Sequence, residues 1–421
     1  MNPKILILGG GFAGLFAARE LRRKLRDSAD IEIINSENYF VFQPLLPEVA
    51  AGSIAPTHAV SPLRYLLPGV AVRKAWIESV DFDAKVVTVF QGVQRRPTKV
   101  SYDHLVIALG QASDLSRIPG MSEHGLTLRT LEDARRLRAH VIERLEHADI
   151  TSSAEIKRGA LTFCVVGGGF SGIETVGEIK ELIDGSLKFY RNIRPEEVRV
   201  ITLEFADRIL GEMPKALSDY AAEDLSKRGI EIRLNTGVAS ATGTQLVTNL
   251  GEVIDTRTVV ATIGSAPSRV VRQMGLGMQN GRISVDRTLQ VPGREGVWAI
   301  GDCAMIPLKD GASARTDFAP PTAQFAVREA RQLAQNVAEV LQSRPVAPFN
   351  YTSQGSLASL GAHRGVADIR GRQVSGFLAW LIWRAYYLSL LPGIGTGMRV
   401  LVNWLLDAFS TRVAVVLRSH D

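Results

Sequence analysis

A glycine-rich pattern occurs twice in this chain, each time after a short apolar run and before a helical one. The first copy spans residues 9–14 and follows the run 4–8, and the second spans 167–172 and follows the run 161–166. Between a strand and a helix, glycines at these spacings allow a tight turn and a close backbone approach to a dinucleotide pyrophosphate. The candidate phosphate-binding residues are Gly9, Gly11, Gly14, Gly167, Gly169 and Gly172.

Two dinucleotide sites in one chain indicate that electrons pass between two bound cofactors, a nicotinamide and a flavin. We therefore expect NADH and FAD. With 421 residues the chain has room for two or three domains. We predict an FAD-binding domain formed by residues 1–128 and 285–343, an NADH-binding domain of residues 129–284, and a C-terminal region of residues 344–421.

Strand and helix signals alternate around both loops, which predicts an α/β fold with parallel, doubly wound sheets. The predicted fold class is two Rossmann-like dinucleotide-binding domains, one inserted in the other, plus the C-terminal region. The expected strands are residues 4–8, 31–35, 86–90, 105–108 and 296–300 for the first domain and 161–166, 198–204, 230–234 and 258–261 for the second. The expected helices include 14–25, 131–150 and 321–341.

The residue that contacts the adenosine ribose is expected at the end of the strand after each loop, and it is normally acidic. In the first domain this place holds Asn35 and Ser36. Asn35 can hydrogen-bond one hydroxyl at a time, and Glu37 is an alternative partner. In the second domain Glu204 can accept from both hydroxyls and repel a 2′-phosphate, which favours NADH over NADPH. Arg208 is interpreted as a surface arginine, although it could pair with a 2′-phosphate.

Other candidate residues lie at the ends of strands and at a helix start. Gly110 and Gly264 each follow the end of a predicted strand, where a loop can pass close to a ligand. Gly301 and Asp302 follow a buried strand and are expected to contact the flavin, with an N-cap role as the alternative for Asp302. Glu174 falls in the first turn of its helix. It is either a carboxylate favoured by the helix dipole or a proton relay beside the reacting rings.

Composition and spacing exclude several classes of protein. The net charge of +6 and the pI near 9.4 suit an anionic ligand or membrane surface, or simply a solvated surface. Cys164 and Cys303 are the only cysteines, so no disulfide framework is expected.

The histidines lack metal-ligand spacing, with His140 and His147 expected to face solvent, so no metal is predicted. No apolar run approaches the roughly 20 residues that span a bilayer, and nucleic-acid binding is not expected.

Several segments resemble the type II NADH:quinone oxidoreductases, which are single-chain respiratory dehydrogenases that do not pump protons. The segments are 38–46, 128–134, 320–329 and 375–383, and the last two are the most discriminating. The resemblance implies that NADH gives a hydride to FAD and that two electrons then pass to a membrane quinone. By motif position, Ala323 and Gln324 would border the quinone headgroup and Asp302 would contact FAD. Glu174 is a candidate source of the protons that the quinone takes up.

The C-terminal region has an amphipathic and basic pattern. If residues 399–410 are helical, one face carries Leu401, Trp404, Leu405, Ala408 and Phe409. The segment 377–388 adds aromatic residues suited to lipid headgroups, namely Trp380, Trp383, Tyr386 and Tyr387 beside Arg384. We therefore expect a peripheral protein on the lipid bilayer surface, at the cytoplasmic face of the inner or plasma membrane. The alternative is an ordinary core helix pair or a homodimer contact.

Two other functions share parts of this pattern. A sulfide:quinone oxidoreductase has the same architecture but needs a cysteine pair at the flavin. Cys164 lies inside a predicted strand and Cys303 directly follows Asp302, so such a pair is not expected. A slow-turnover, NADH-binding flavoprotein scaffold would have no need of the quinone segment around Gln324.

Overall fold

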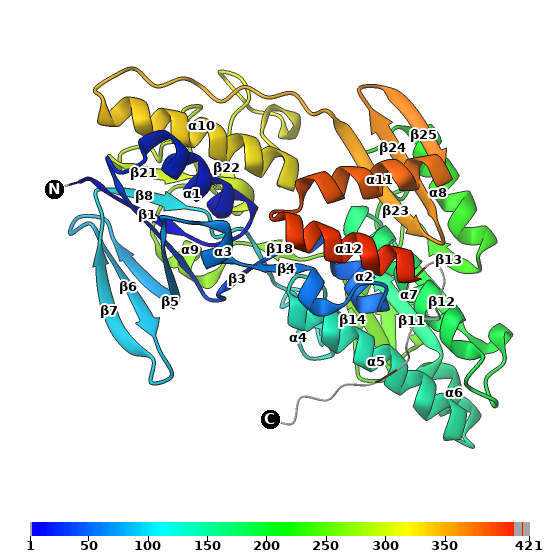
Figure 1. Ribbon diagram of the computed structural model, residues 1–421. Coiled ribbons are helices and arrows are strands. Elements are labelled where there is room, and N and C mark those ends of the chain that lie inside the picture. The colour runs from blue at the N-terminus through cyan, green and yellow to red at the C-terminus, as the bar shows by residue number, and fades with distance from the viewer. Residues whose placement is uncertain (1, 408–414, 416–421) are drawn as a thin grey trace. The chain divides into compact units, whose positions relative to one another are not determined.

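The computed structural model describes residues 2–407 and 415 (Figure 1), and these residues form two compact units. Unit 1 combines the described residues of 1–40, 61–112 and 265–353, and unit 2 combines those of 41–60, 113–264 and 354–421. Each unit contains a sheet whose central strands are parallel, together with helices and one of the two glycine-rich loops. The predicted α/β class with two dinucleotide-binding folds is thereby confirmed.

Unit 1 is built on a seven-stranded sheet in the order β21-β8-β1-β2-β5-β6-β7. These strands are β21 (Val297–Ala299), β8 (His104–Ile107), β1 (Lys4–Leu8), β2 (Asp30–Asn35), β5 (Ala71–Asp81), β6 (Val86–Gln91) and β7 (Arg96–Ser101). Ile5 to Leu8 have no exposed surface, because β1 lies in the middle of a sheet covered on both faces. The helices α1 (Phe12–Leu25) and α10 (Ala323–Leu341) lie side by side in Figure 1 and pack against each other.

The sheet of unit 1 is mixed, which differs from the parallel sheet expected from the sequence. From β21 to β5 neighbouring strands are parallel, whereas β6 pairs antiparallel with both β5 and β7. The reason is the short connection of residues 82–85 between β5 and β6, since a parallel neighbour needs a longer crossover. The smaller elements of unit 1 are α3 (Leu63–Leu66), α9 (Arg269–Gln273), β19 (Met278–Gln279), β20 (Arg282–Ser284) and β22 (Ala304–Met305).

Unit 2 contains a five-stranded parallel sheet in the order β10-β17-β11-β12-β13. Its strands are β10 (Gly125–Thr127), β17 (Thr258–Ala261), β11 (Thr162–Val166), β12 (Arg199–Leu203) and β13 (Ile230–Arg233). Its helices are α2 (Leu46–Ala51), α4 (Met121–His124), α5 (Leu131–Ile150), α6 (Ala154–Ala160), α7 (Phe170–Leu187) and α8 (Lys215–Lys227). A three-stranded antiparallel sheet of β14 (Val238–Ala241), β15 (Gln245–Thr248) and β16 (Val253–Asp255) completes this part.

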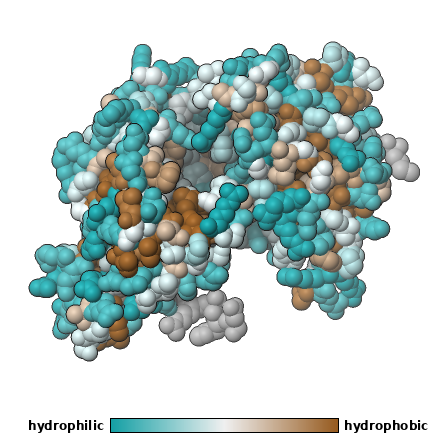
Figure 2. Space-filling model, turned by 180° about the vertical axis from the view of Figure 1, so that it is seen from behind, coloured by the Kyte–Doolittle hydropathy of each residue, from teal (hydrophilic) through white to brown (hydrophobic). Residues whose placement is uncertain are grey.

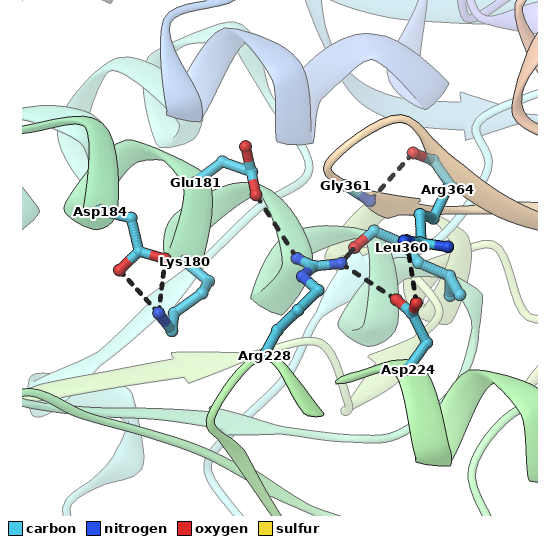
Figure 3. A network of polar contacts seen from close by, with 9 residues as sticks. Lys180, Glu181, Asp184, Asp224, Arg228, Leu360, Gly361 and Arg364 are labelled. Carbon is cyan, nitrogen blue, oxygen red and sulfur yellow. Dashed lines mark hydrogen bonds and ion pairs between the residues drawn. The ribbon is translucent and has the colours of Figure 1, made fainter. Parts of the chain in front are cut away.

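The C-terminal segment of unit 2 forms an antiparallel sheet and two helices. They are β23 (Gly355–Gly361), β24 (Arg364–Ile369), β25 (Arg372–Gly376), α11 (Phe377–Leu390) and α12 (Ile394–Asp407). β23 packs so closely on α7 that a Cβ at Gly177 would lie 2.3 Å from the Leu360 carbonyl oxygen. Arg228 donates to the same oxygen at 2.6 Å and pairs with Asp224 and Glu181 (Figure 3). The C-terminal sheet is therefore fixed to α7 and α8.

Two details of unit 2 correct the sequence-based expectations. His140 does not face solvent, because its Nε2 lies 3.0 Å from both the Arg257 carbonyl and the Thr258 hydroxyl, and burial lowers its pKa to about 4. The last helix begins at Ile394, five residues before the predicted start, and Ala408 and Phe409 lie outside the described residues. No helix in the described part of the chain has the length and apolarity needed to cross a bilayer.

Candidate functional site: two phosphate loops

The two glycine-rich loops have the same backbone geometry in both units. Gly9 donates its N–H to Ile34 and Gly167 to Leu203, in both cases at 2.8 Å. A Cβ on Gly14 would lie 1.9 Å from the Gly9 carbonyl oxygen, and one on Gly172 would lie 1.8 Å from that of Gly167. Only glycine allows α1 and α7 to approach their loops so closely.

Both loops leave their helix starts open to an anionic ligand. Gly11 and Gly169 are the N-cap residues of α1 and α7, and neither helix has a side-chain cap. A Cβ at either position would meet no atom within 4 Å. The first N–H groups of each helix can therefore bind phosphate oxygens. These features fit a dinucleotide pyrophosphate at each of the two loops.

The two ribose candidates occupy equivalent places and also hold the loops. Asn35 accepts the N–H of Gly10 at 2.8 Å through Oδ1, and Glu204 accepts that of Gly168 at 2.5 Å through Oε2. Asn35 donates its amide to the carbonyl of Glu37, and Glu204 takes a second backbone N–H, from Ala206. The sequence pattern did not reveal this loop-holding role. Arg208 donates to the Gly211 carbonyl at 2.6 Å.

The three candidate glycines outside the phosphate loops adopt backbone conformations that favour glycine. Gly110, Gly264 and Gly301 have φ values of +59°, +80° and +72°. Asp302 lies in a short 3₁₀ turn and caps no α-helix, since the N-cap of α10 is Thr322. The N-cap alternative for Asp302 was therefore wrong, and Asp302 remains a candidate for flavin contact.

Glu329 is a buried carboxyl that the sequence reasoning missed. Its Oε2 accepts the N–H of Gly301 at 2.7 Å, and its side chain is almost fully buried on α10. Burial raises its pKa to about 8, with Asp302 adding to the rise. Glu329 thus holds the turn that carries Asp302. The sequence did contain a signal for its burial. Glu329 is a charged residue on the same helix face as the apolar residues Phe325, Ala326, Ala330 and Leu333.

Gln324 lies in the first turn of α10, next to Ala323. Its Oε1 accepts hydrogen bonds from the Tyr351 hydroxyl at 3.0 Å and the Ser353 hydroxyl at 3.3 Å. The Tyr351 ring also packs edge-on against Phe325 and beneath the Arg328 guanidinium. These contacts orient the Gln324 side chain. Tyr351 and Ser353 were not predicted, because they lie in the segment between α10 and β23.

Glu174 connects α7 to the C-terminal segment of unit 2. Its Oε1 accepts the Ser359 backbone N–H at 3.2 Å and the Trp383 indole N–H at 2.9 Å. Burial raises the pKa of Glu174 to about 8 despite both hydrogen bonds, so its carboxyl is mainly neutral at pH 7. The position of Glu174 in the first turn, expected from the sequence, was wrong, because α7 begins at Phe170 and Glu174 is its fifth residue.

Glu174→Gln should remove a pH-dependent contribution to stability. Unfolded Glu174 releases its proton near pH 4.5, whereas the folded protein retains it up to about pH 8. Wild-type stability should therefore fall across this window, by up to about 1.4 kcal/mol per pH unit for this group. The Tm of Glu174→Gln relative to wild type should rise from pH 5 to pH 8, as measured by calorimetry. The exposed control Glu123→Gln should show no such trend, and a constant Tm difference for Glu174→Gln would contradict the prediction.

A second buried cluster fixes the C-terminal helices to α2. Glu48 accepts the Trp404 indole N–H at 3.0 Å and lies 3.8 Å from the Arg384 guanidinium. That guanidinium lies 3.8 Å from the centre of the Trp380 ring and 4.6 Å from that of Trp404. Trp380, Trp383 and Trp404 are buried. The prediction that Trp380 and Trp383 face lipid headgroups was therefore wrong, because both are buried and contact Arg384 and Glu174. Trp404, which was predicted to lie on the apolar face of the last helix, is buried against Glu48.

Comparison with known proteins places this geometry in a family. Residues 3–330 match the model of the pyridine nucleotide-disulphide oxidoreductases, and residues 353–413 match that of the NDH2 C-terminal domain. A type II NADH:quinone oxidoreductase of Mycobacterium tuberculosis is 31% identical, over 97% of this chain and 89% of that protein. The chain belongs to the type II NADH:quinone oxidoreductases. A demethylphylloquinone reductase of Synechocystis is 30% identical, over 96% of both chains.

Solved structures agree with this fold. The NDH2 of Plasmodium falciparum in complex with NADH has a TM-score of 0.89 at 21% identity, covering 99% of this chain and all of that one. The sulfide:quinone oxidoreductase of Aquifex aeolicus has a TM-score of 0.72 at 19% identity, covering 91% of this chain and 90% of that one. A protein named for a different electron donor, sulfide, therefore has a similar fold. The fold alone does not identify the electron donor.

The cysteines argue against the sulfide alternative. Cys164 is fully buried in β11 of unit 2, and Cys303 is buried in unit 1 with its Sγ 3.3 Å from the Ile300 carbonyl. Burial raises the pKa of both thiols to about 12. Neither is an available thiolate nucleophile. Among residues 2–407 and 415, no group of three or more potential ligand side chains could hold a metal ion.

Proposed function

We propose that this chain oxidises NADH and reduces a membrane quinone through bound FAD, without pumping protons. The observation that carries the proposal is the pair of equivalent, uncapped glycine loops in a chain of the type II family. The FAD domain is assigned to residues 1–128 and 285–343, the NADH domain to residues 129–284, and the C-terminal region to residues 344–421. When bound, FAD would accept a hydride from NADH and supply two electrons to the quinone.

Each loop has residues suited to its cofactor. In the first, Gly9, Gly11 and Gly14 would hold the FAD pyrophosphate, with Asn35 and Ser36 at the ribose and Gly110, Gly301 and Asp302 beside the rest of the molecule. In the second, Gly167, Gly169 and Gly172 would hold NADH, with Glu204 at its ribose and Gly264 nearby. Because the Glu204 carboxylate would repel a 2′-phosphate, NADH is preferred over NADPH.

Two side chains are assigned to the quinone reaction. Gln324, held by Tyr351 and Ser353, carries two amide N–H donors that can bind a quinone carbonyl as it gains negative charge. Glu174 is protonated at neutral pH, so its carboxyl can hold a proton for delivery to the reduced product. In this proposal Gln324 positions the quinone and Glu174 supplies a proton to it.

Anaerobic stopped-flow absorbance tests the proposed function directly. NADH should bleach the flavin band of the purified protein, and a soluble quinone should then restore it. NADPH should act more slowly, and sulfide should not bleach the band at all, because no thiolate is available to take sulfur. A colourless protein, or bleaching by NADH that quinone never reverses, would refute the proposal.

Membrane attachment is proposed to occur through α11 and α12. These helices expose large apolar side chains that no other described element covers, namely Phe377, Leu378, Leu381, Ile394, Met398, Leu401, Val402, Leu405 and Leu406. The face drawn in Figure 2 is mostly hydrophilic, with hydrophobic residues in separate groups. An apolar helical face of this kind can lie in a bilayer interface. This supports a peripheral location on the cytoplasmic membrane face, where the quinone is available.

Replacing two apolar residues of α12 with charged ones should weaken lipid binding. Met398 and Leu405 are 56% and 55% exposed and two turns apart on one face. The double variant Met398→Glu/Leu405→Glu should bind phosphatidylethanolamine–phosphatidylglycerol vesicles roughly tenfold more weakly in sedimentation assays. The matched control Leu250→Glu/Val253→Glu changes two exposed residues outside α11 and α12. Equal sedimentation of both double variants would rule out α12 as the attachment face.

A further inference from the structure

Phe205 is a large apolar side chain that is 76% exposed beside the second glycine loop. It directly follows Glu204, whose carboxylate accepts the N–H of Gly168 in that loop. Phe205 therefore lies just beyond the carboxyl end of β12. In parallel α/β sheets, ligands bind outside this edge.

The backbone on both sides of Phe205 is fixed to the neighbouring strand connection. The Glu204 carbonyl accepts the N–H of Thr236 at 2.8 Å, and the Ala206 carbonyl accepts that of Asn235 at 2.9 Å. The ring lies close over Gly237, where a Cβ would be 3.1 Å from Phe205 Cδ2. Gly237 is itself held by a hydrogen bond to the side chain of Asn249. Phe205 thus presents a supported aromatic surface with most of its area open.

We propose that Phe205 is the stacking platform for the adenine of NADH and that it makes the protein prefer the dinucleotide over reduced nicotinamide mononucleotide. The inference rests on the proposed function, and it adds a contact that the glycine loop and Glu204 do not supply. A bound adenine would remove exposed aromatic surface from water, and purine rings stack well on phenyl rings. Glu204 would hold the ribose of the same adenosine, so the two consecutive residues contact its sugar and its base.

The test compares NADH with reduced nicotinamide mononucleotide, which has the same reactive ring but no adenosine. In the holoenzyme, Phe205→Ala should raise the KM for NADH about tenfold and leave kcat nearly unchanged. The kcat/KM for the mononucleotide should not change. Phe205→Trp should retain the wild-type KM for NADH. Phe189→Ala, which removes another exposed phenyl ring of unit 2, is the matched control and should have no effect.

Binding of ADP-ribose separates the outcomes. Its dissociation constant, measured by calorimetry, should rise in Phe205→Ala in parallel with the KM for NADH. An unchanged constant would overturn the inference, and so would an equal loss of activity with the mononucleotide, which would indicate a distorted nicotinamide site. If NADH fails to reduce the wild-type protein, the proposed function fails, and ADP-ribose binding still tests the role of Phe205.

Discussion

A Gly172→Ala variant is expected to keep its flavin and to lose reduction by NADH. The added Cβ would lie 1.8 Å from the Gly167 carbonyl oxygen, and this backbone atom cannot move aside without opening the second loop. The start of α7 would then no longer reach the NADH pyrophosphate. We expect the rate of flavin bleaching at a fixed low NADH concentration to fall on the order of 10²-fold or more, since positioning is lost.

The equivalent change in the first loop provides the contrast. Gly14→Ala would place a Cβ 1.9 Å from the Gly9 carbonyl oxygen, so this variant should purify without its yellow colour. Gly185→Ala is the control, because a Cβ there meets no atom within 4 Å, and it should resemble wild type in both measurements. If Gly14→Ala and Gly172→Ala lose flavin to the same degree, the assignment of one cofactor to each loop is wrong.

Gln324→Ala should slow reoxidation by quinone and leave reduction by NADH nearly intact. The substitution removes the amide that Tyr351 and Ser353 orient. Removing one preorganised donor to an oxygen that gains negative charge typically costs on the order of 10²-fold in rate. Double-mixing stopped-flow measurements, with NADH first and a soluble quinone second, separate the two half-reactions.

Two variants sharpen this test. Tyr351→Phe removes one of the two hydroxyls that hold Gln324 Oε1, so it should slow only the second half-reaction and by less than Gln324→Ala. Gln332→Ala changes a glutamine two turns further along α10 that bonds Asn336, and it should have no effect on either step. Equal slowing of both half-reactions in Gln324→Ala would remove this residue from the quinone site.

The sequence predicted the phosphate loops well because their geometry is local. Gly9 and Gly14 lie close together in space and are only a few residues apart in the sequence, so the spacing of the glycines is enough to predict the turn. The helix 131–150 was also predicted with its observed bounds, and in the structure Thr130 and Asp133 form a capping box at its start, which is again a local contact.

Long-range contacts were not predictable in the same way. Trp404 and Leu405 are neighbours on a predicted apolar face, yet Trp404 is buried against Glu48, more than 350 positions earlier, while Leu405 is exposed. Glu329 and Gly301 meet only because α10 folds back onto the sheet of unit 1. A helical pattern shows which residues share a face, but the partner of that face depends on tertiary structure.

The hydrogen bond from each loop to the end of the following strand has a consequence for how long the two nucleotides stay bound. The same position carries a neutral amide in one copy, Asn35, and a negative carboxylate in the other, Glu204. A carboxylate repels a nearby diphosphate, whereas an amide does not. In the proposed assignment, the prosthetic group that must remain through many cycles would occupy the uncharged copy. The co-substrate that must depart after every turnover would occupy the copy whose charge favours its release.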